Sequence, residues 1–390
     1  MSNNRKTKKG KSFMLNLVSW LHLWPSLVSG IILIFVCLSG TIIVYSDEIV
    51  EWTAGDAKYI EPGNKKLPLE ILMNIQKKEF PGLLPSYVLY YKDPNRALVI
   101  NTFDPKKIAL SMVYIDPYTG KILKHDKTIH FFFIMAHLHA HFKIGTVGGW
   151  IIAIATVIFV ISTITGLVLW WPKRWTKNKV KASFTVRWKA RFKRLNYDFH
   201  NVYGFYSLII CFILGLSGLI LFFQPLMNIS MKAFGGTTID WHKQLPKAIP
   251  DKEFIDSFPL MDHLFAEQPT KKVIKYWVYD YQKSGVFSFN LADRAGIKSD
   301  ENNHTFYFDK YTGNPYPIQK QQHMHNKVEI WIWQLHMGQW WGQFGKLSTF
   351  LAGIISTTLP ITGFLIWWGR RKKKKKKTKT QNPIFQTEGT

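Results

Sequence analysis

Four long apolar stretches constrain this chain more than any other feature, because each is long enough to cross a lipid bilayer. A helix rises ~1.5 Å per residue, so about twenty apolar residues cross a hydrocarbon core of ~30 Å. The stretches cover residues 26–46, 148–171, 203–226 and 346–368. The first has a basic leader but no small-residue cleavage motif, so we expect an uncleaved helix. The sequence therefore predicts four spanning helices separated by two long polar segments.

Positive charge is concentrated in three short segments. Residues 1–16 hold five basic and no acidic residues, residues 172–199 ten basic and one acidic, and residues 369–390 nine basic and one acidic. These segments carry +22 of the formal net charge of +26. In a four-span chain all three lie on one side, which is typical of cytoplasmic loops and termini. We therefore expect both termini to be cytoplasmic. We also expect the basic segments to lie against the lipid bilayer and not to bind nucleic acid.

The expected organisation is a membrane all-α four-helix core, built by internal duplication, with two extracytoplasmic α+β domains. Its parts are a basic tail (1–16), a first span (17–46), a first outer domain (47–130), a histidine segment with the second span (131–171), a basic loop (172–199), a third span (200–226), a second outer domain (227–330), a histidine segment with the fourth span (331–368) and a polybasic tail (369–390).

Two repeated patterns support the duplication. His22 and His200 are each followed eighteen residues later by a Ser-Gly pair that ends at Gly40 and Gly218. A second series shifts by 197 residues between its two copies. It comprises His139, Gly145, Gly148, Thr165-Gly166 and Trp170-Trp171, matched by His336, Gly342, Gly345, Thr362-Gly363 and Trp367-Trp368. Repeats of this length indicate one structural unit used twice.

The topology places the four repeated histidines in two pairs. His22 and His200 begin the first and third spans on the cytoplasmic side, whereas His139 and His336 precede the second and fourth spans on the outer side. Two imidazoles from different helices are the axial ligands that a b-type haem requires. The pattern therefore predicts two haems b, one at each face of the membrane.

Further residues bear on this prediction. The two cysteines are Cys37 and Cys211, and the chain lacks a Cys-x-x-Cys-His motif, so the haems would be held non-covalently. Four glycines of Ser/Thr-Gly pairs would let a flat macrocycle approach the helix backbone: Gly40, Gly166, Gly218 and Gly363. Three arginines before His200 are candidate partners of haem propionates: Arg187, Arg191 and Arg194.

Two more histidines flank His139. On a helix, His137 and His141 share one face and His139 points away. They could bind a transition metal or face solvent, and only His139 obeys the 197-residue offset. Because one straight helix from His139 to Trp171 would be ~48 Å long, we expect the glycines at 145, 148 and 149 to bend it.

Each polar segment is predicted to be α+β. The first holds a helix over 67–80 and strands over 87–91, 96–103 and 111–115, followed by Asp-Pro-Tyr-Thr-Gly. The second holds a helix near 252–266 and strands near 273–281, 284–290 and 305–309, followed by Lys-Tyr-Thr-Gly. Neither contains a Gly-rich nucleotide loop, so electrons must come from another molecule.

These motifs together resemble the PepSY-associated transmembrane family, and the resemblance covers nearly all of residues 13–370. It implies PepSY-like outer domains and a bacterial inner-membrane location. It also implies a haem-dependent oxidoreductase that reduces ferric siderophores outside the cytoplasm and releases Fe(II). The donor would be quinol or a cytoplasmic flavoprotein.

Two other functions remain open from the sequence. The chain could be a non-catalytic membrane anchor whose outer domains bind or inhibit an envelope partner such as a protease. It could also handle a metal through His137 and His141. The colour of the purified protein would separate the haem protein from both alternatives.

Overall fold

The computed structural model describes residues 13–172, 174–239, 241–278, 281–297 and 299–380. The outer parts of both basic tails, 1–12 and 381–390, lie outside the described residues. The chain forms two compact units. The helical unit contains residues up to Thr41, His139–Leu219 and residues from Phe350 onward, and the sheet unit contains Ile42–Leu138 and Ile220–Thr349.

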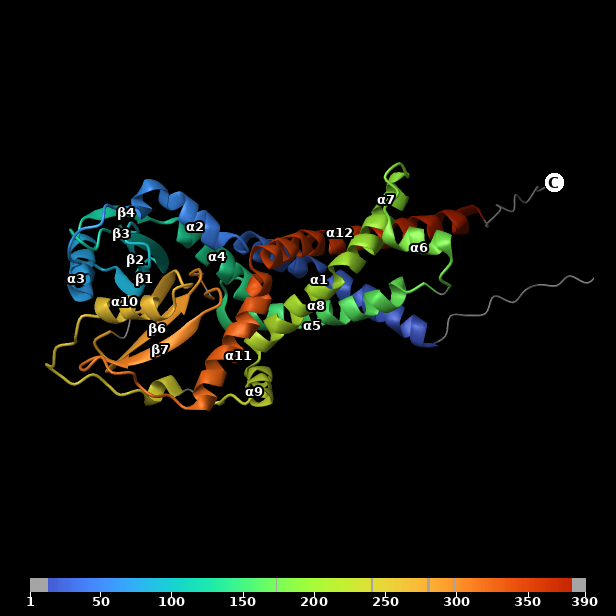
Figure 1. Ribbon diagram of the computed structural model, residues 1–390. Coiled ribbons are helices and arrows are strands. Elements are labelled where there is room, and N and C mark those ends of the chain that lie inside the picture. The colour runs from blue at the N-terminus through green and yellow to red at the C-terminus, as the bar shows by residue number, and fades with distance from the viewer. Residues whose placement is uncertain (1–12, 173, 240, 279–280, 298, 381–390) are drawn as a thin grey trace, which may run out of the picture. The chain divides into compact units, whose positions relative to one another are not determined.

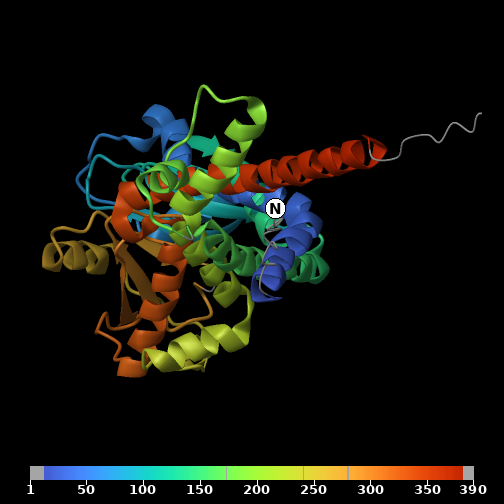
Figure 2. The same ribbon diagram turned by 90° about the vertical axis from the view of Figure 1, so that its right-hand side faces the viewer.

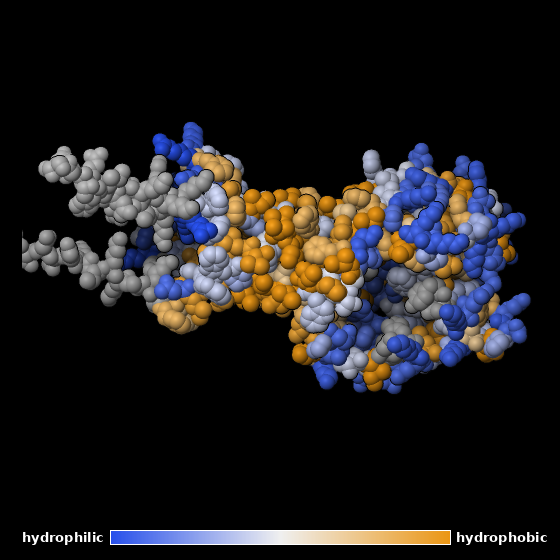
Figure 3. All heavy atoms as spheres, turned by 180° about the vertical axis from the view of Figure 1, so that it is seen from behind, coloured by the Kyte–Doolittle hydropathy of each residue, from blue (hydrophilic) through white to orange (hydrophobic). Residues whose placement is uncertain are grey.

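The helical unit is built on α1 (Phe13–Ile43), α5 (Gly145–Trp170), α8 (Gly204–Phe222) and α12 (Gly342–Thr380). Four segments of the described chain are long and apolar enough to span a membrane: Phe13–Ile43, Gly145–Trp170, Phe192–Phe222 and Gln339–Arg371. Apolar side chains remain exposed on these helices, including Val28, Ile31, Ile154, Ile209 and Leu351. Figure 3 shows this hydrophobic covering. A large exposed apolar surface is typical of a membrane or protein interaction site, and the four apolar helices fit the predicted four-span membrane protein.

Three short helical segments occupy one end of the helical unit. They are α6 (Lys177–Phe184), α7 (Phe192–Asp198) and a π-helical turn, η2 (Phe199–Tyr203), that continues into α8. The described start of α1 and the end of α12 lie at the same end (Figures 1 and 2). The described part of the basic loop therefore lies at the same end of the unit as the described start of α1 and end of α12, as the four-span topology predicts.

The sheet unit contains a single antiparallel sheet of seven strands in the order β4-β3-β2-β1-β5-β6-β7. Its strands are β1 (Leu84–Tyr91), β2 (Leu98–Asp104), β3 (Ala109–Ile115), β4 (Ile122–Asp126), β5 (Val273–Trp277), β6 (Val286–Ala292) and β7 (His304–Asp309). At its centre β1 pairs with β5, with Leu89 opposite Lys275. The expectation of two separate outer domains is corrected here, because both polar segments build one sheet. Pairing β1 with β5 removes two edges that would otherwise expose unpaired backbone groups.

Alternating side chains of the sheet face two cores. Val88 and Tyr90 point to the core formed with α3 (Leu69–Glu79) and α10 (Phe258–Glu267). Tyr87 and Leu89 point to the opposite core, which contains residues of α2 (Ser46–Ala54) and α4 (Thr128–His141). This period of two is what strands buried on both faces require. The predicted strands and the helices α3 and α10 are confirmed, whereas α2 and β4 were not anticipated.

The remaining elements belong to the sheet unit. They are η1 (Gly55–Lys58), α9 (Gln224–Ala233), η3 (Trp241–Gln244), α11 (Lys320–Met337) and η4 (Gln339–Trp341). The turns after β3 and β7 end at Gly120 and Gly313, whose φ angles are 73° and 74°. The Thr-Gly motifs therefore meet the predicted need for a residue that tolerates positive φ.

Candidate functional site

The structure brings His22 and His200 together within the helical unit. His22 lies in α1 and His200 in η2, the π-helical turn before α8. Their ring centroids are 6.3 Å apart and the ring planes are inclined by 79°. A π-helical turn is common at functional sites because it re-aims a side chain that a regular helix would direct elsewhere. These are the two histidines that the sequence pairs at the cytoplasmic face.

The separation of the two rings fits two axial ligands of one metal. An imidazole nitrogen lies about 2 Å from a bound first-row metal ion, and the ring centre lies about 1 Å beyond that nitrogen. Two imidazoles on opposite sides of one iron therefore have ring centroids about 6 Å apart. The observed 6.3 Å matches this spacing.

Hydrogen bonds place the proton of His22 on Nδ1. This atom lies 3.2 Å from the Ser162 carbonyl oxygen and 3.2 Å from Thr165 Oγ1. A carbonyl oxygen only accepts, and the Thr165 hydroxyl already donates to the Ile161 carbonyl at 2.8 Å. Nδ1 must therefore carry the hydrogen, and Nε2 is the unprotonated nitrogen that can bind a metal.

His200 repeats this arrangement on α12. Its Nδ1 lies 2.9 Å from Thr362 Oγ1. The Thr362 hydroxyl donates to the carbonyls of Thr358 and Leu359 at 3.1 and 3.0 Å, so its oxygen accepts from His200. Thr165 and Thr362 are separated by the 197-residue offset of the sequence pattern. Both rings are thus fixed in the tautomer that presents Nε2.

The glycines that follow these threonines lie against the same rings. A Cβ at Gly166 would lie 3.2 Å from His22 Cε1, and a Cβ at Gly363 would lie 3.2 Å from His200 Cε1. We expected these glycines to admit a macrocycle, and in the structure their nearest neighbour is an imidazole edge. Each Thr-Gly pair therefore forms a seat for one histidine ring, in which Thr accepts the Nδ1 hydrogen and Gly leaves room for Cε1.

His139 has a similar seat on α1. Its Nδ1 donates to the Val36 carbonyl at 2.8 Å, and a Cβ at Gly40 would lie 2.8 Å from its Cε1. Burial lowers the pKa of His139, and the bond to Val36 opposes this only in part. A neutral imidazole is the form that binds a metal.

The partner predicted for His139 belongs to the other unit. His336 lies near the end of α11 in the sheet unit, and Gly218 lies in α8 beside the buried Ser217. The pairing of His139 with His336, and the role of Gly218, stay predictions.

His137 makes contacts within its own helix. Its Nδ1 donates to the Phe133 carbonyl at 2.8 Å, and its ring packs against Phe133 with centroids 3.9 Å apart. Among the described residues, no group of three or more His, Cys, Asp or Glu could hold a metal ion. A site made from His137 and His141 alone would supply two ligands, and it stays a prediction.

The helix break after the histidine segment has a clear cause. α4 ends at His141 and α5 begins at Gly145, which has a φ of 63°. A Cβ at Gly148 would lie 2.0 Å from the His141 carbonyl oxygen, so only glycine allows this approach. A similar break precedes α12, where Gly342 has a φ of 55° and a Cβ at Gly345 would lie 2.3 Å from the Gly338 carbonyl oxygen. The predicted bend is confirmed.

Two residues that sequence reasoning passed over hold the segment before His200. Asp198 is buried and lies 2.9 Å from Arg194 Nε, and it accepts from the Arg187 backbone N–H at 3.3 Å. Asn196 donates to the Thr362 carbonyl at 3.1 Å. Arg194 therefore has a carboxylate partner within the chain. The available signal was that Asp198 is the one acidic residue of the basic loop.

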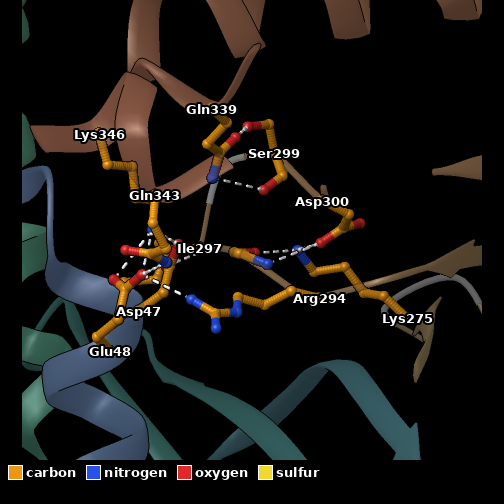
Figure 4. Close-up of polar contacts among 11 residues, drawn as sticks. Asp47, Glu48, Lys275, Arg294, Ile297, Ser299, Asp300, Gln339, Gln343 and Lys346 are labelled. Carbon is orange, nitrogen blue, oxygen red and sulfur yellow. Dashed lines mark hydrogen bonds and ion pairs between the residues drawn. The ribbon is translucent and has the colours of Figure 1, made fainter. Parts of the chain in front are cut away.

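The sheet unit contains a second polar cluster, around the buried Lys346 and Asp47, which Figure 4 shows. Lys346 Nζ lies 2.8 Å from Glu48 and 3.4 Å from Asp47. Arg294 also pairs with Glu48 at 2.8 Å, and the Ile297 backbone N–H donates to Asp47 at 2.9 Å. Burial raises the pKa of Asp47, and Lys346 opposes this only in part.

The pKa of Glu48 shifts in the opposite direction. Its partial burial works toward a higher pKa, but hydrogen bonds from Gln343 and Lys346 hold the pKa below its ordinary value. Nearby, Lys275 pairs with Asp300 at 2.9 Å, and both side chains are buried. The cluster joins the start of α2, the loop after β6 and the start of α12 by paired charges.

The family model described as PepSY-associated TM region matches residues 19–370. None of the curated proteins matches the chain.

Proposed function

Because the chain belongs to the PepSY-associated TM family and the ring centroids of His22 and His200 lie 6.3 Å apart, we propose that it is a di-haem b transmembrane electron-transfer protein. Its activity in this proposal is the reduction of ferric siderophores on the extracytoplasmic side, with release of Fe(II). Haem supplies one-electron chemistry when bound.

The observation that carries the proposal is the tautomer and spacing of His22 and His200. Their Nε2 atoms would hold the inner haem, while Ser162, Thr165 and Thr362 keep the proton on Nδ1. Such second contacts orient a ligating ring and raise its basicity. By the internal duplication that we infer, His139 and His336 would hold the outer haem, with Gly40 seating the His139 ring and Gly218 against the haem.

The direction of electron flow follows from the charge distribution. The basic loop and tails would lie in the cytoplasm of a bacterium, with the spans in its inner membrane. Quinol or a cytoplasmic flavoprotein would then donate at the His22/His200 end, and the acceptor would be reduced at the outer end. A ferric siderophore suits this role because Fe(II) binds hard oxygen chelators less tightly than Fe(III).

The first test is the haem content of protein purified from haem-replete cells. A reduced-minus-oxidised spectrum of b type with about two haems per chain is expected. A colourless preparation would contradict the proposal.

The second test concerns the acceptor. Dithionite-reduced protein is mixed anaerobically with chemically different ferric siderophores, while haem re-oxidation and Fe(II) capture by a chromogenic chelator are followed together. Re-oxidation that yields captured Fe(II) supports the proposal. Haem that stays reduced with every siderophore tested rules out this class of acceptor.

A further inference from the structure

The segment between α5 and α8 carries many cations with almost no acidic partner. We call residues 174–194, which include α6 and the first part of α7, the cationic platform. Eight of its basic side chains are exposed: Arg174, Lys177, Lys179, Lys181, Arg187, Lys189, Arg191 and Lys193. In the described part of the platform only Arg194 has an ion pair, which is with Asp198. The platform is therefore a surface of uncompensated positive charge.

Aromatic contacts fix the platform to the spanning helices. The Trp170 ring stacks on Phe205 of α8, with centroids 3.8 Å apart and planes inclined by 13°. Trp170 Nε1 donates to the Ser183 carbonyl at 3.3 Å, and the Tyr206 hydroxyl donates to the Phe184 carbonyl at 3.1 Å. The end of α6 is thus held against both α5 and α8.

The second half of the platform is fixed through buried Asp198. This carboxylate pairs with Arg194 and accepts the Arg187 backbone N–H. Positive side chains that repel one another would favour an extended, mobile loop. Here two anchors hold them as a defined surface at the end of the bundle (Figures 1 and 2).

Large aromatic side chains stand exposed beside the cations. Trp171, Trp175, Trp188 and Phe192 have exposed fractions of 58, 52, 68 and 68%. In water this exposure is unfavourable. At a bilayer surface, indole and phenyl rings lie at the headgroup level while Lys and Arg reach the phosphates.

We propose that the cationic platform is a binding surface for anionic phospholipid headgroups. Two observations favour lipid over an acidic protein. The platform directly joins the ends of two membrane-spanning segments, Gly145–Trp170 and Phe192–Phe222, so a bilayer surface is adjacent to it. Its exposed rings also alternate with its cations, as in interfacial segments. The inference is independent of haem binding.

The experiment titrates lipid into delipidated full-length protein in a non-ionic detergent. The thermal unfolding midpoint is measured against the mole fraction of phosphatidylglycerol or phosphatidylcholine. The wild type should show a saturable rise with phosphatidylglycerol and none with phosphatidylcholine. Each surface Lys or Arg contributes about fivefold to such binding. The triple variant Lys189→Gln/Arg191→Gln/Lys193→Gln should therefore need on the order of 100-fold more phosphatidylglycerol for half the effect.

A matched control removes the same charge from the sheet unit. Lys77→Gln/Lys78→Gln/Lys107→Gln changes three exposed lysines and should leave the half-effect mole fraction unchanged. Trp188→Ala should weaken lipid binding without changing the charge.

Four outcomes would overturn the proposal. These are an equal response to the two lipids, a platform variant that responds like the wild type, inorganic phosphate alone giving the full rise, and polyglutamate displacing the lipid. If the triple variant does not fold, the response of the wild type to salt tests the proposal. Added NaCl should weaken its stabilisation by phosphatidylglycerol, and a stabilisation that NaCl leaves unchanged would contradict the proposal.

Discussion

Two polar clusters satisfy their side chains with different chemistry, one around the half-buried His22 and His200 and one around the buried Lys346 and Asp47. In the helical unit, His22 and His200 donate to uncharged acceptors, a backbone carbonyl and threonine hydroxyls. In the sheet unit, Lys346 pairs with two carboxylates, and Lys275 pairs with Asp300. Both arrangements satisfy groups that are costly to bury.

The two clusters differ in which of their polar groups are paired. The ion cluster satisfies itself, because each of these lysines meets an opposite charge. Within the described residues, the hydrogen bonds of His22 and His200 all use Nδ1. The two rings are therefore fixed through Nδ1, with their centroids 6.3 Å apart. The lysine cluster, in which each charge has a partner, supports the fold. The histidine pair, in which only Nδ1 of each ring is used, is suited to binding a ligand.

The largest expected effect tests the histidine pair. His200→Ala should abolish the inner haem and leave about one haem per chain, because a single imidazole cannot complete bis-histidine ligation. The pyridine haemochrome content and the reduced spectrum measure this. The control His323→Ala changes an exposed histidine of α11 and should retain both haems. If His200→Ala retained two haems per chain, His200 could not be a haem ligand.

The next effect tests the lysine cluster. Lys346→Met leaves Asp47 buried without its amine partner, and breaking a buried ion pair in this way costs about 3–5 kcal/mol. We expect a lower thermal unfolding midpoint with unchanged haem content per folded chain. Lys107→Met, at an exposed position, is the matched control. Loss of haem without loss of stability would mean that the ion cluster also serves the redox site.

The sequence predicted much of the fold because its signals are periodic. Apolar length gives the four spans, and alternation gives the strands around Val88 and Tyr90. What it did not give was the pairing of β1 with β5, since strand partners far apart in the chain carry no local signal. α2 was missed because its start, Ser46-Asp47-Glu48, resembles a polar boundary after the first span.

The candidate site was predicted in part for a similar reason. The repeats singled out His22 and His200 in one series, and Thr165-Gly166 and Thr362-Gly363 in the other, where they accompany His139 and His336. The structure joins the two series, because His22 lies against Thr165 and Gly166, and His200 lies against Thr362 and Gly363. The sequence could not show that Thr and Gly form the seat of a ring, because that contact joins different helices. Asp198 and Asn196 were passed over because neither belongs to the repeated pattern.

A smaller effect is expected at the seat itself. A Cβ at Gly363 would lie 3.2 Å from His200 Cε1, so Gly363→Ala must displace the ring by a few tenths of an ångström. Overpacking of this kind costs about 1–3 kcal/mol, and we expect weaker retention of the inner haem during purification. Gly369→Ala is the control in the same helix, because a Cβ there meets nothing within 4 Å. Equal haem retention in both variants would show that the His200 ring can accommodate a methyl group at Gly363.

The smallest effect concerns the acid response of the ion cluster. The pKa of Glu48 is lowered in the folded state, so this residue contributes stability above its ordinary pKa and loses it as pH falls through the lowered value. The pKa of Asp47 is raised, so its ionisation costs stability as pH rises through the ordinary value toward the raised one. The two neighbours therefore have opposite slopes.

Removing one carboxylate at a time separates these slopes. The destabilisation caused by Glu48→Gln should be greatest near neutral pH and should shrink in acid, by about 1 kcal/mol or less because Glu48 is partly exposed. For Asp47→Asn the pH-dependent part has the other sign, so the variant should compare more favourably with the wild type at neutral pH than in acid. Thermal midpoints of both variants and the wild type between pH 7 and about pH 3 measure this, because the scan must pass below the ordinary pKa of Glu48, 4.5, and that of Asp47, 3.8. If the unfolding midpoint depends on pH in the same way in both variants, Asp47 and Glu48 titrate as equivalent surface carboxylates. The difference between the ion cluster and the histidine pair would then rest on their geometry alone.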